Sequence, residues 1–221
     1  TSGIKIATLS ERMHGLELSA FDELPLPVGA VVGGELRDPK VIIEGLRTLA
    51  EKHHIHLANV ALPEARGYLF EADVPDGSPV EQRVSVERRL DEYVPLPAKE
   101  VVFDVAPVGK GSTGVRVVGT GYARRVVEET LSVVEDARIR TRSIESETFA
   151  LPRALLLHGD TETVLIIDSG KTTTKLLVVT KRLPRYVTTL DIGGHALTLA
   201  VVKHFGVSEE EAKRVKAERG I

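Results

Sequence analysis

The chain is poor in the residues that build disulfides, thiolate metal centres and aromatic surfaces. Its 221 residues include no cysteine, no tryptophan and one methionine, and aromatic residues make up only 4%. Without cysteine the chain can form neither a disulfide nor a thiolate metal site, which fits a reducing compartment. No apolar run reaches the roughly 18 residues that a membrane-spanning helix needs. These absences argue against a disulfide-rich secreted protein and against direct membrane insertion.

The composition that remains is globular. Apolar residues make up 42% and charged residues 28% of the chain, which is enough for one large or two small cores. The net charge of −3 gives no electrostatic reason to expect nucleic acid as a partner. The first residue is Thr1 and a strand pattern follows at once, while the last residues end just past a helix pattern. We therefore expect a fragment that is truncated at both ends.

The order of hydrophobic patterns predicts a mixed α/β chain in three blocks. Asp38 followed by Pro39 is typical of a helix start, with a cap residue and a proline in the first turn. The first block has strands at 3–9, 15–26 and 55–63 and a helix at 38–53. The second has strands at 67–74, 100–107 and 114–120 and helices at 79–94 and 122–136. The third has strands at 163–170, 173–180 and 185–193 and helices at 195–206 and 208–220.

The stretch "DSGKTTTKLLVV", residues 168–179, contains the letters Gly-Lys-Thr of a Walker phosphate loop. A Walker loop needs a glycine at position 165, which is leucine here, and a helix after the lysine, where this chain has a β-branched strand pattern. The stretch therefore predicts two antiparallel strands joined by a tight turn that contains Gly170.

Two interpretations of this hairpin remain open. One is an ordinary β-hairpin with a glycine turn. The other is an anion-binding hairpin, in which backbone N–H groups and the hydroxyls of Thr172 and Thr173 hold phosphate oxygens. Asp168 would then stand at the mouth of the hairpin, where it could hold a metal ion through water.

The first residues, "TSGIKIATL", repeat part of this motif. Lys5 precedes an apolar run, as Lys175 does, and small or hydroxylated residues precede both. Asp168 lies seven positions before Lys175, so the matching acid for Lys5 would lie three residues before Thr1. An internal repeat of this kind says much about a fold. Two such hairpins facing each other would clamp one polyphosphate between two lobes.

These segments resemble the actin-like ATPase superfamily, in which two hairpins grip the nucleotide phosphates. Three further segments resemble that superfamily in the right order along the chain: "ESETFALPRAL" (145–155), "LDIGGHALT" (190–198) and "EEAKRVKAERG" (210–220). The resemblance implies an α/β, ribonuclease H-like fold of two lobes, with ATP and Mg²⁺ bound between them.

The same resemblance implies roles for individual residues. Asp168 would position the metal and its water, and Glu147 would orient the water that attacks the γ-phosphate. We find no activated nucleophile, so the expected enzyme is at most a slow ATPase. The residues implied in nucleotide binding are Thr1, Ser2, Lys5, Gly170, Lys171, Thr172, Thr173, Gly193, Gly194 and Lys216. His195 and Lys171 depart from the residue types usual at their positions.

The middle of the chain resembles the PilM family of type IV pilus assembly proteins. The resemblance lies in "NVALPEARGYLFEADVP" (59–75), "ERRLDEYVPLPAKEVVFDV" (87–105) and "ESETFALPRALLL" (145–157), and "EYVPLP" (92–97) is its most particular element. It implies a first lobe of residues 1–65 and 138–158, an inserted β/α subdomain of residues 66–137, and an incomplete second lobe of residues 159–221.

The resemblance also implies a partner and a location. The groove between the first lobe and the inserted subdomain would bind the N-terminal cytoplasmic peptide of a bitopic inner-membrane pilus protein, and self-association is a further expectation. The protein would be a cytoplasmic scaffold that is peripheral to the inner membrane through this partner. Two alternatives stay open: a filament protein of cell division like FtsA, and a sugar or metabolite kinase, for which we find no sugar-pocket signature.

Overall fold

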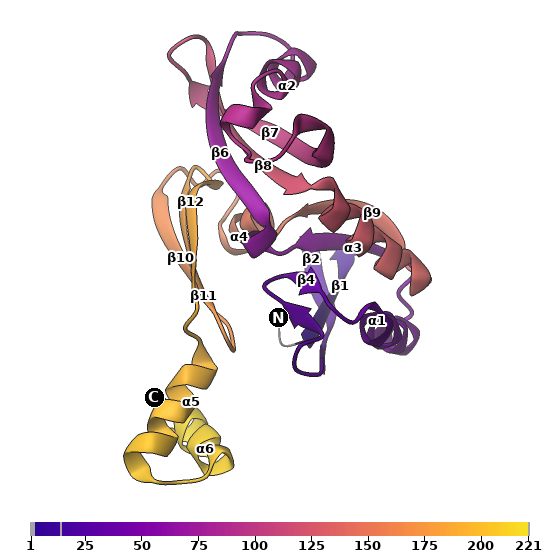
Figure 1. Ribbon diagram of the computed structural model, residues 1–221, viewed down its shortest axis with the longest axis vertical. Coiled ribbons are helices and arrows are strands. Elements are labelled where there is room, and N and C mark those ends of the chain that lie inside the picture. The colour runs from indigo at the N-terminus through magenta and orange to yellow at the C-terminus, as the bar shows by residue number, and fades with distance from the viewer. Residues whose placement is uncertain (1–2, 14, 221) are drawn as a thin grey trace.

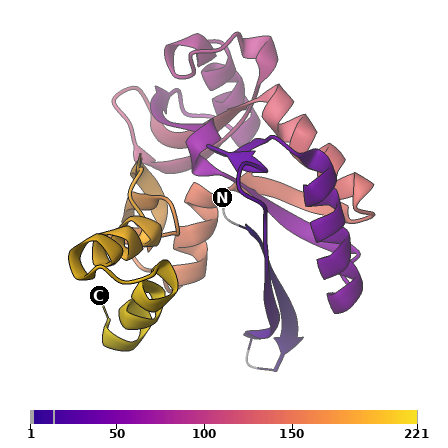
Figure 2. The same cartoon turned by 60° about the horizontal axis from the view of Figure 1, so that its bottom comes forward.

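The structure is a computed structural model that describes residues 3–13 and 15–220. It places the elements in three groups along the molecule (Figure 1). One group holds the N-terminal elements with residues 140–155, a second holds a three-stranded sheet, and a third holds another three-stranded sheet followed by two helices. We call these groups the first lobe, the inserted part and the second lobe, after the predicted division. The helices α5 and α6 and the hairpin β1–β2 point away from the inserted sheet, as the view in Figure 2 makes clear.

The first lobe is built from a hairpin, a pair of parallel strands and the helices beside them. Strands β1 (Gly3–Arg12) and β2 (Gly15–Pro25) pair antiparallel, and the short strands β3 (Val31–Val32) and β4 (Glu35–Leu36) form a second small hairpin. Strand β5 (Leu57–Leu62) pairs in parallel with β9 (Arg140–Ser146). Because parallel neighbours need a crossover connection, the whole inserted part fits between these two strands in the sequence.

Helix α1 (Pro39–His53) begins as the sequence predicts. The Asp38 side chain accepts a hydrogen bond from the Val41 N–H, and Pro39 occupies the first turn. At the other end of α1, the His53 ring Nε2 lies 2.7 Å from Asp22 Oδ2 of β2, and Lys52 lies equally close to the same oxygen. His53 and Lys52 thus tie the end of α1 to the β1–β2 hairpin. The buried core between α1 and α3 (Arg124–Asp136) comprises Ala50, Val134, Ala137 and Ile139.

The inserted part is an antiparallel sheet in the order β6–β8–β7, formed by Gly67–Val74, Val115–Ala123 and Val101–Lys110. Helix α2 (Pro79–Glu87) packs on it and starts with a complete capping box between Ser78 and Glu81. The predicted helix 79–94 is too long, because after Glu87 the chain passes into short 3₁₀ turns at Leu90–Glu92 and Ala98–Glu100. Leu90 in the first of these turns and Val94 just after it are buried in the same core as Val86, so the apolar pattern alone could not locate the helix end.

The second lobe is a meander of β10 (Thr163–Ser169), β11 (Thr174–Thr180) and β12 (Leu183–Leu190), followed by α5 (Gly194–Phe205) and α6 (Glu209–Arg219). The antiparallel pairing predicted for the first two strands is confirmed. Helix α4 (Glu147–Leu155) of the first lobe lies against this sheet. Its Leu151 packs on a small core of Ile166, Leu177 and Val179, so the two lobes share an apolar contact.

Candidate functional site

The turn of the β10–β11 hairpin leaves backbone donors free. The Gly170 N–H donates to the Thr173 carbonyl oxygen at 2.8 Å, which closes the turn. Among the described residues, the N–H groups of Lys171, Thr172 and Thr173 donate to no backbone or side-chain acceptor. A Cβ at position 170 would lie 3.1 Å from the Thr173 carbonyl oxygen, so glycine allows this tight closure. The hairpin therefore offers several adjacent N–H donors at one point, as an anion-binding loop requires.

The start of α5 packs against this turn and fixes its position. The N–H groups of Gly194 and His195 donate to the carbonyl oxygens of Gly170 and Lys171, at 2.9 and 2.8 Å. A Cβ on Gly193 would lie 2.7 Å from both carbonyl oxygens, so only glycine permits this approach. The two glycines thus support the hairpin turn, and their direct contact with a nucleotide stays a prediction.

Lys216 of α6 lies at the same end of the lobe. Its Nζ donates to the Gly194 carbonyl oxygen at 2.7 Å and to Thr198 Oγ1 at 3.0 Å. The Thr198 side chain is buried, and its hydroxyl also donates to the Gly194 carbonyl oxygen. Lys216 thereby joins α6 to the first turn of α5, one element away from the hairpin. The structure brings this residue close to the candidate phosphate loop, while its contact with a nucleoside stays a prediction.

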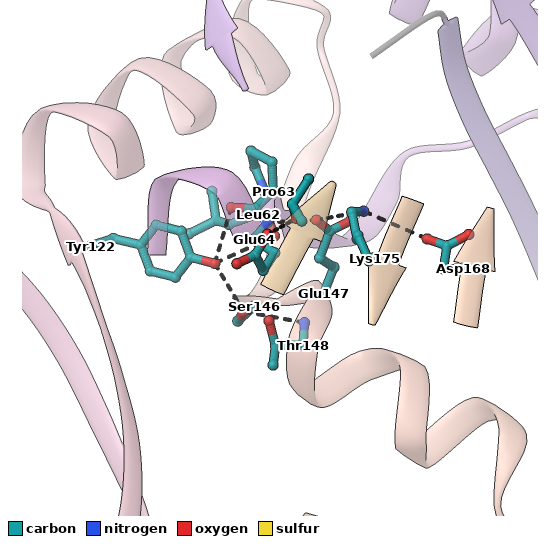
Figure 3. A network of polar contacts seen from close by, with 10 residues as sticks. Leu62, Pro63, Glu64, Tyr122, Ser146, Glu147, Thr148, Asp168 and Lys175 are labelled. Atoms are coloured by element: carbon teal, nitrogen blue, oxygen red, sulfur yellow. Dashed lines mark hydrogen bonds and ion pairs between the residues drawn. The ribbon is translucent and has the colours of Figure 1, made fainter. Parts of the chain in front are cut away.

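Glu147 and Asp168 meet at the boundary between the lobes, where a lysine joins them (Figure 3). Glu147 is the first residue of α4, and its Oε1 lies 2.8 Å from Lys175 Nζ while also accepting the Glu64 N–H. Lys175 Nζ lies 3.6 Å from Asp168 Oδ2. The two predicted catalytic residues therefore come together through a third residue, which links an acid of the first lobe to an acid of the second.

A second group of contacts continues this boundary. In the second-lobe sheet, Lys175 stands directly opposite Asp168 on β10 and Thr189 on β12, so the three side chains form one row. Thr189 Oγ1 donates to the Glu64 carboxylate, which belongs to a short 3₁₀ turn after β5. Ile166 and Leu177 of the apolar core follow Asp168 and Lys175 at a spacing of two residues along their strands, so the core and the polar row lie on the same face of the sheet. The lobes are thus held on this one face by polar side chains near the hairpin turn and by the apolar core at α4 beyond them.

The residues at this boundary offer few of the oxygen ligands that a magnesium ion needs. Mg²⁺ prefers six oxygen ligands and keeps several waters when it is bound with substrate phosphates. The part of the chain that the structure describes has no group of three or more acidic or histidine side chains suited to hold a metal. The Asp168 side chain is 43% exposed and offers one carboxylate. It fits a hydrated ion that takes its remaining ligands from phosphate oxygens.

Of the residues predicted to bind phosphate at the start of the chain, Lys5 is among those that the structure describes. Thr1 and Ser2 lie outside the described residues. Lys5 is on β1, where its side chain is 65% exposed and its Nζ lies 3.9 Å from Glu23 Oε2 of β2. At that exposure and distance the ion pair is weak, and the lysine is free to turn towards another anion. Its part in nucleotide binding stays a prediction.

A cavity of about 270 Å³ opens between the inserted sheet and the first lobe. Five consecutive residues of β7, from Val102 to Ala106, line it. Neighbouring strand residues point to opposite faces, so a cavity that touches all five runs along the strand edge. This is the edge without a paired strand among the described residues, because β7 is the last strand in the order β6–β8–β7. The remaining lining residues are Leu62, Thr120, Tyr122, Val127, Ile144, Glu145, Ser146, Phe149 and Arg153.

Tyr122 links this groove to the boundary between the lobes. Its hydroxyl lies 2.9 Å from Ser146 Oγ, and burial raises the pKa of Tyr122 to about 12, so the phenol stays protonated. Ser146 in turn caps α4 by accepting the Thr148 N–H at 3.2 Å. The residue after Ser146 is Glu147, the partner of Lys175. One chain of contacts therefore runs from the groove wall to the candidate nucleotide site (Figure 3).

The comparison with protein families decides the identity of the chain. A family model described as type IV pilus assembly protein PilM matches residues 1–221. The chain belongs to the PilM family. The resemblance of residues 59–157 to the PilM family is therefore confirmed. The match favours this family over the two alternatives, an FtsA-like division protein and a sugar or metabolite kinase.

Solved structures agree with the fold of a PilM-family chain. One is a PilM–PilN type IV pilus biogenesis complex, with a TM-score of 0.79 at 23% identity, covering 99% of this chain and 67% of that one. Another is the cytoplasmic domain of EpsL, an inner-membrane component of the type II secretion system of Vibrio cholerae, with a TM-score of 0.58 at 13% identity, covering 94% and 72%. The predicted actin-like α/β fold is confirmed by these similarities.

A third similar structure is the ethanolamine utilization protein EutJ from Carboxydothermus hydrogenoformans. Its TM-score is 0.56 at 18% identity, and the match covers 98% of this PilM-family chain and 58% of EutJ.

Of the helices within residues 3–13 and 15–220, none is long and apolar enough to cross a membrane.

Sequence reasoning missed three members of the site, namely Lys175, Glu64 and Tyr122. Lys175 could have been predicted from the sequence, because the pairing register of the hairpin places it opposite Asp168 once the turn is known. Glu64 and Tyr122 reach the site through contacts between distant segments, and no local pattern marks them.

Proposed function

We propose that this PilM-family chain is a scaffold of the type IV pilus assembly machinery that binds a short peptide of an inner-membrane pilus protein. The observation behind this proposal is the groove beside β7, an apolar cavity along an unpaired strand edge. A strand edge with free backbone groups can bind an extended peptide by adding it to the sheet. The similarity to a PilM–PilN type IV pilus biogenesis complex supports a partner of this kind.

The lining of the groove suggests what the peptide contains. Val102, Ile144 and Phe149 offer apolar contacts, and the carboxylates of Asp104 and Glu145 lie among them. Glu145 is paired with Arg153, whereas within the described part of the chain the Asp104 carboxylate accepts a hydrogen bond from the Val105 N–H alone. A peptide with apolar side chains and one basic residue next to Asp104 would complement this surface. The partner would be the N-terminal cytoplasmic segment of a bitopic protein, which would hold the scaffold at the inner membrane.

Binding of labelled peptides, followed by fluorescence anisotropy, tests this part. We expect N-terminal cytoplasmic peptides of the inner-membrane pilus proteins to bind the wild type, and one of them to bind more than tenfold more weakly to Ala106→Phe, which fills the groove. Ala98→Phe is the matched control, because Ala98 is exposed and does not line the cavity. Equal binding to wild type and Ala106→Phe would exclude this groove as the peptide site.

We further propose that ATP with Mg²⁺ binds between the lobes at the β10–β11 hairpin. Support comes from the free N–H groups of Lys171, Thr172 and Thr173, with the hydroxyls of both threonines as additional donors. When bound, Mg²⁺ would supply positive charge to the phosphate oxygens. Asp168 would hold its waters, and Lys216 and the glycine pair at α5 would keep the hairpin in place.

Any hydrolysis at this site would be slow. Glu147 is the candidate for orienting a water molecule, yet its Oε1 already contacts Lys175 Nζ and the Glu64 N–H. These two contacts fix the orientation of the carboxylate, so a water molecule would have to lie at Oε2, in the directions that this orientation allows. We therefore propose a nucleotide-dependent scaffold rather than a rapid enzyme, and self-association stays a further proposal.

Isothermal titration calorimetry with ATP and Mg²⁺ tests the nucleotide proposal. We expect heat of binding with the wild type, at least tenfold weaker binding for Asp168→Ala, and unchanged binding for Asp76→Ala. Asp76 is exposed in the inserted part and serves as the control for loss of a carboxylate. No heat with the wild type, or identical titrations for wild type and Asp168→Ala, would reject the proposed site.

A further inference from the structure

We propose that Lys175 is a built-in cation of the interlobe site, which joins Glu147 to Asp168 when no nucleotide is bound and competes with a divalent metal. The inference deepens the proposed nucleotide site and rests on that proposal only for the position of the phosphates. The ion pairs themselves do not depend on it.

The geometry of Lys175 is that of a bridging cation. Its Nζ lies 2.8 Å from Glu147 Oε1 and 3.6 Å from Asp168 Oδ2, so one ammonium contacts a carboxylate from each lobe. The side chain of Lys175 is only 20% exposed and that of Glu147 only 24%, which limits screening by water and salt. Figure 3 shows the ammonium between the two carboxylates. Such half-buried charge pairs interact more strongly than pairs in open solvent.

The charges around Lys175 explain why this position needs a cation. Glu147 and Asp168 face it, and the Glu64 carboxylate lies on the same side, where it accepts the Thr189 hydroxyl. Among the described residues, Lys175 is the one cation that pairs with either Glu147 or Asp168. Without it, carboxylates from two lobes would face each other with no positive charge between them. We therefore expect the lobes to repel unless a metal ion replaces the ammonium.

The same arrangement places Lys175 in competition with a metal. A divalent ion held by the Asp168 carboxylate, directly or through water, would lie near the ammonium, because Lys175 Nζ is 3.6 Å from Asp168 Oδ2. The two cations repel each other, so a metal alone is a poor ligand for this site. A nucleotide changes the balance, since its phosphates give the ammonium a charged acceptor of its own. Lys175 would then move from Glu147 to the phosphates, two residues along β11 from the turn, and release Glu147.

Binding of Mn²⁺ without nucleotide, followed by the loss of the free-ion signal in electron paramagnetic resonance, tests the inference. We expect weak binding by the wild type, at least tenfold tighter binding by Lys175→Met, and weak binding by Lys175→Arg, which keeps the charge. Lys203→Met is the matched control, because Lys203 is exposed on α5. Equal Mn²⁺ affinity for wild type and Lys175→Met would overturn the proposal. Nucleotide is absent from this experiment, so its outcome does not depend on whether ATP binds.

Chemical labelling gives a second test that does not require the Lys175→Met variant to fold. We expect acetic anhydride to modify Lys175 several-fold more slowly than the exposed Lys203 in the wild type, as measured by mass spectrometry. In Glu147→Gln the nearest partner of the ammonium loses its charge, and the labelling of Lys175 should rise at least threefold while that of Lys203 stays constant. An unchanged rate at Lys175 would show that Glu147 does not hold it, and would overturn the proposal.

Discussion

The Tyr122 hydroxyl of the inserted sheet lies 2.9 Å from the hydroxyl of Ser146, the residue that caps helix α4. This contact joins the wall of the groove beside β7 to the helix that begins with Glu147. The carbonyl oxygens of Leu62 and Pro63 lie at 3.5 and 3.3 Å from the same phenol oxygen. The phenol thus lies where β5, β8 and α4 meet, so its removal should weaken contacts between these three elements.

Tyr122→Phe should lower the free energy of unfolding by about 0.5–1.5 kcal/mol, because it removes a buried hydroxyl and leaves Ser146 with one partner fewer. Urea denaturation measures this loss. Tyr68→Phe is the control, since Tyr68 is 36% exposed and belongs to the same sheet. We also expect Tyr122→Phe to weaken peptide binding, because Tyr122 lines the groove. A stability equal to that of wild type would mean that the hydroxyl contributes no net hydrogen bond.

Asp73 holds the "GKGSTG" loop, residues 109–114, in place and should make the stability of the inserted part depend on pH. Hydrogen bonds from Arg116 and Ser112 lower the pKa of the Asp73 carboxyl well below its ordinary value of 3.8. A lowered pKa in the folded state means that the stabilising contribution is complete above the unfolded pKa. It is lost as the pH falls through the folded pKa.

Asp73→Asn should therefore be less stable than wild type at pH 7, and the difference should shrink as the pH falls below 3. Thermal denaturation of both proteins across this range measures it. Asp76 lies three residues after Asp73 and is exposed, so Asp76→Asn should have the stability of the wild type across this range. A constant difference between Asp73→Asn and wild type over the whole range would contradict the assignment.

Gly193→Ala should displace the turn of the β10–β11 hairpin. The new Cβ would lie 2.7 Å from the carbonyl oxygens of Gly170 and Lys171, and backbone atoms cannot move aside as flexible side chains do. We expect a loss of about 1–3 kcal/mol in the free energy of unfolding, as for other overpacked sites. Weaker ATP binding should accompany it.

Gly194→Ala is the comparison for this prediction. Its Cβ would meet the Lys216 Nζ at 3.3 Å, which is the mobile end of a long side chain, and alanine suits the first turn of a helix. Thermal denaturation should therefore show a smaller effect for Gly194→Ala than for Gly193→Ala. The reverse order would mean that the hairpin turn does not rest on Gly193.

Much of this architecture could be predicted from local patterns. Asp38 and Pro39 mark the start of α1, and the sequence around Gly170 indicates a hairpin rather than a Walker loop. Strand β9 was missed because "RTRSIES" contains two arginines and no clear alternation. It is a strand because it pairs in parallel with β5, which is more than 70 residues away in sequence. Such pairing has no local signal.

In the candidate site, too, some residues could be predicted from local sequence and others depend on contacts between distant segments. The position of Asp168 at the mouth of a hairpin could be predicted from the residues nearest to it, and the pairing register then places Lys175 opposite it. The contact of Lys175 with Glu147 requires the second lobe to dock on α4, which only the folded chain decides. For the same reason, Gly193 and Gly194 read as ligand-binding glycines in the sequence, whereas in the structure they pack against the hairpin turn.

Arg185 and Glu71 connect β12 of the second lobe to β6 of the inserted sheet, and they should be energetically coupled. Arg185 Nε lies 3.0 Å from Glu71 Oε1, and a second guanidinium nitrogen lies 3.3 Å from Oε2, so the pair is bidentate. Both side chains are about 30% exposed, which weakens screening relative to a fully exposed pair. A double-mutant cycle of Glu71→Ala and Arg185→Ala should give a coupling of about 0.5–1 kcal/mol in urea denaturation.

The same cycle with Arg89 and Glu92, a pair within one segment of the inserted part, should give a smaller coupling energy, because both of its side chains are about half exposed. If the effects of Glu71→Ala and Arg185→Ala simply add, this pair does not hold the second lobe to the inserted sheet, and the apolar contact at α4 and the Lys175 bridge must do so.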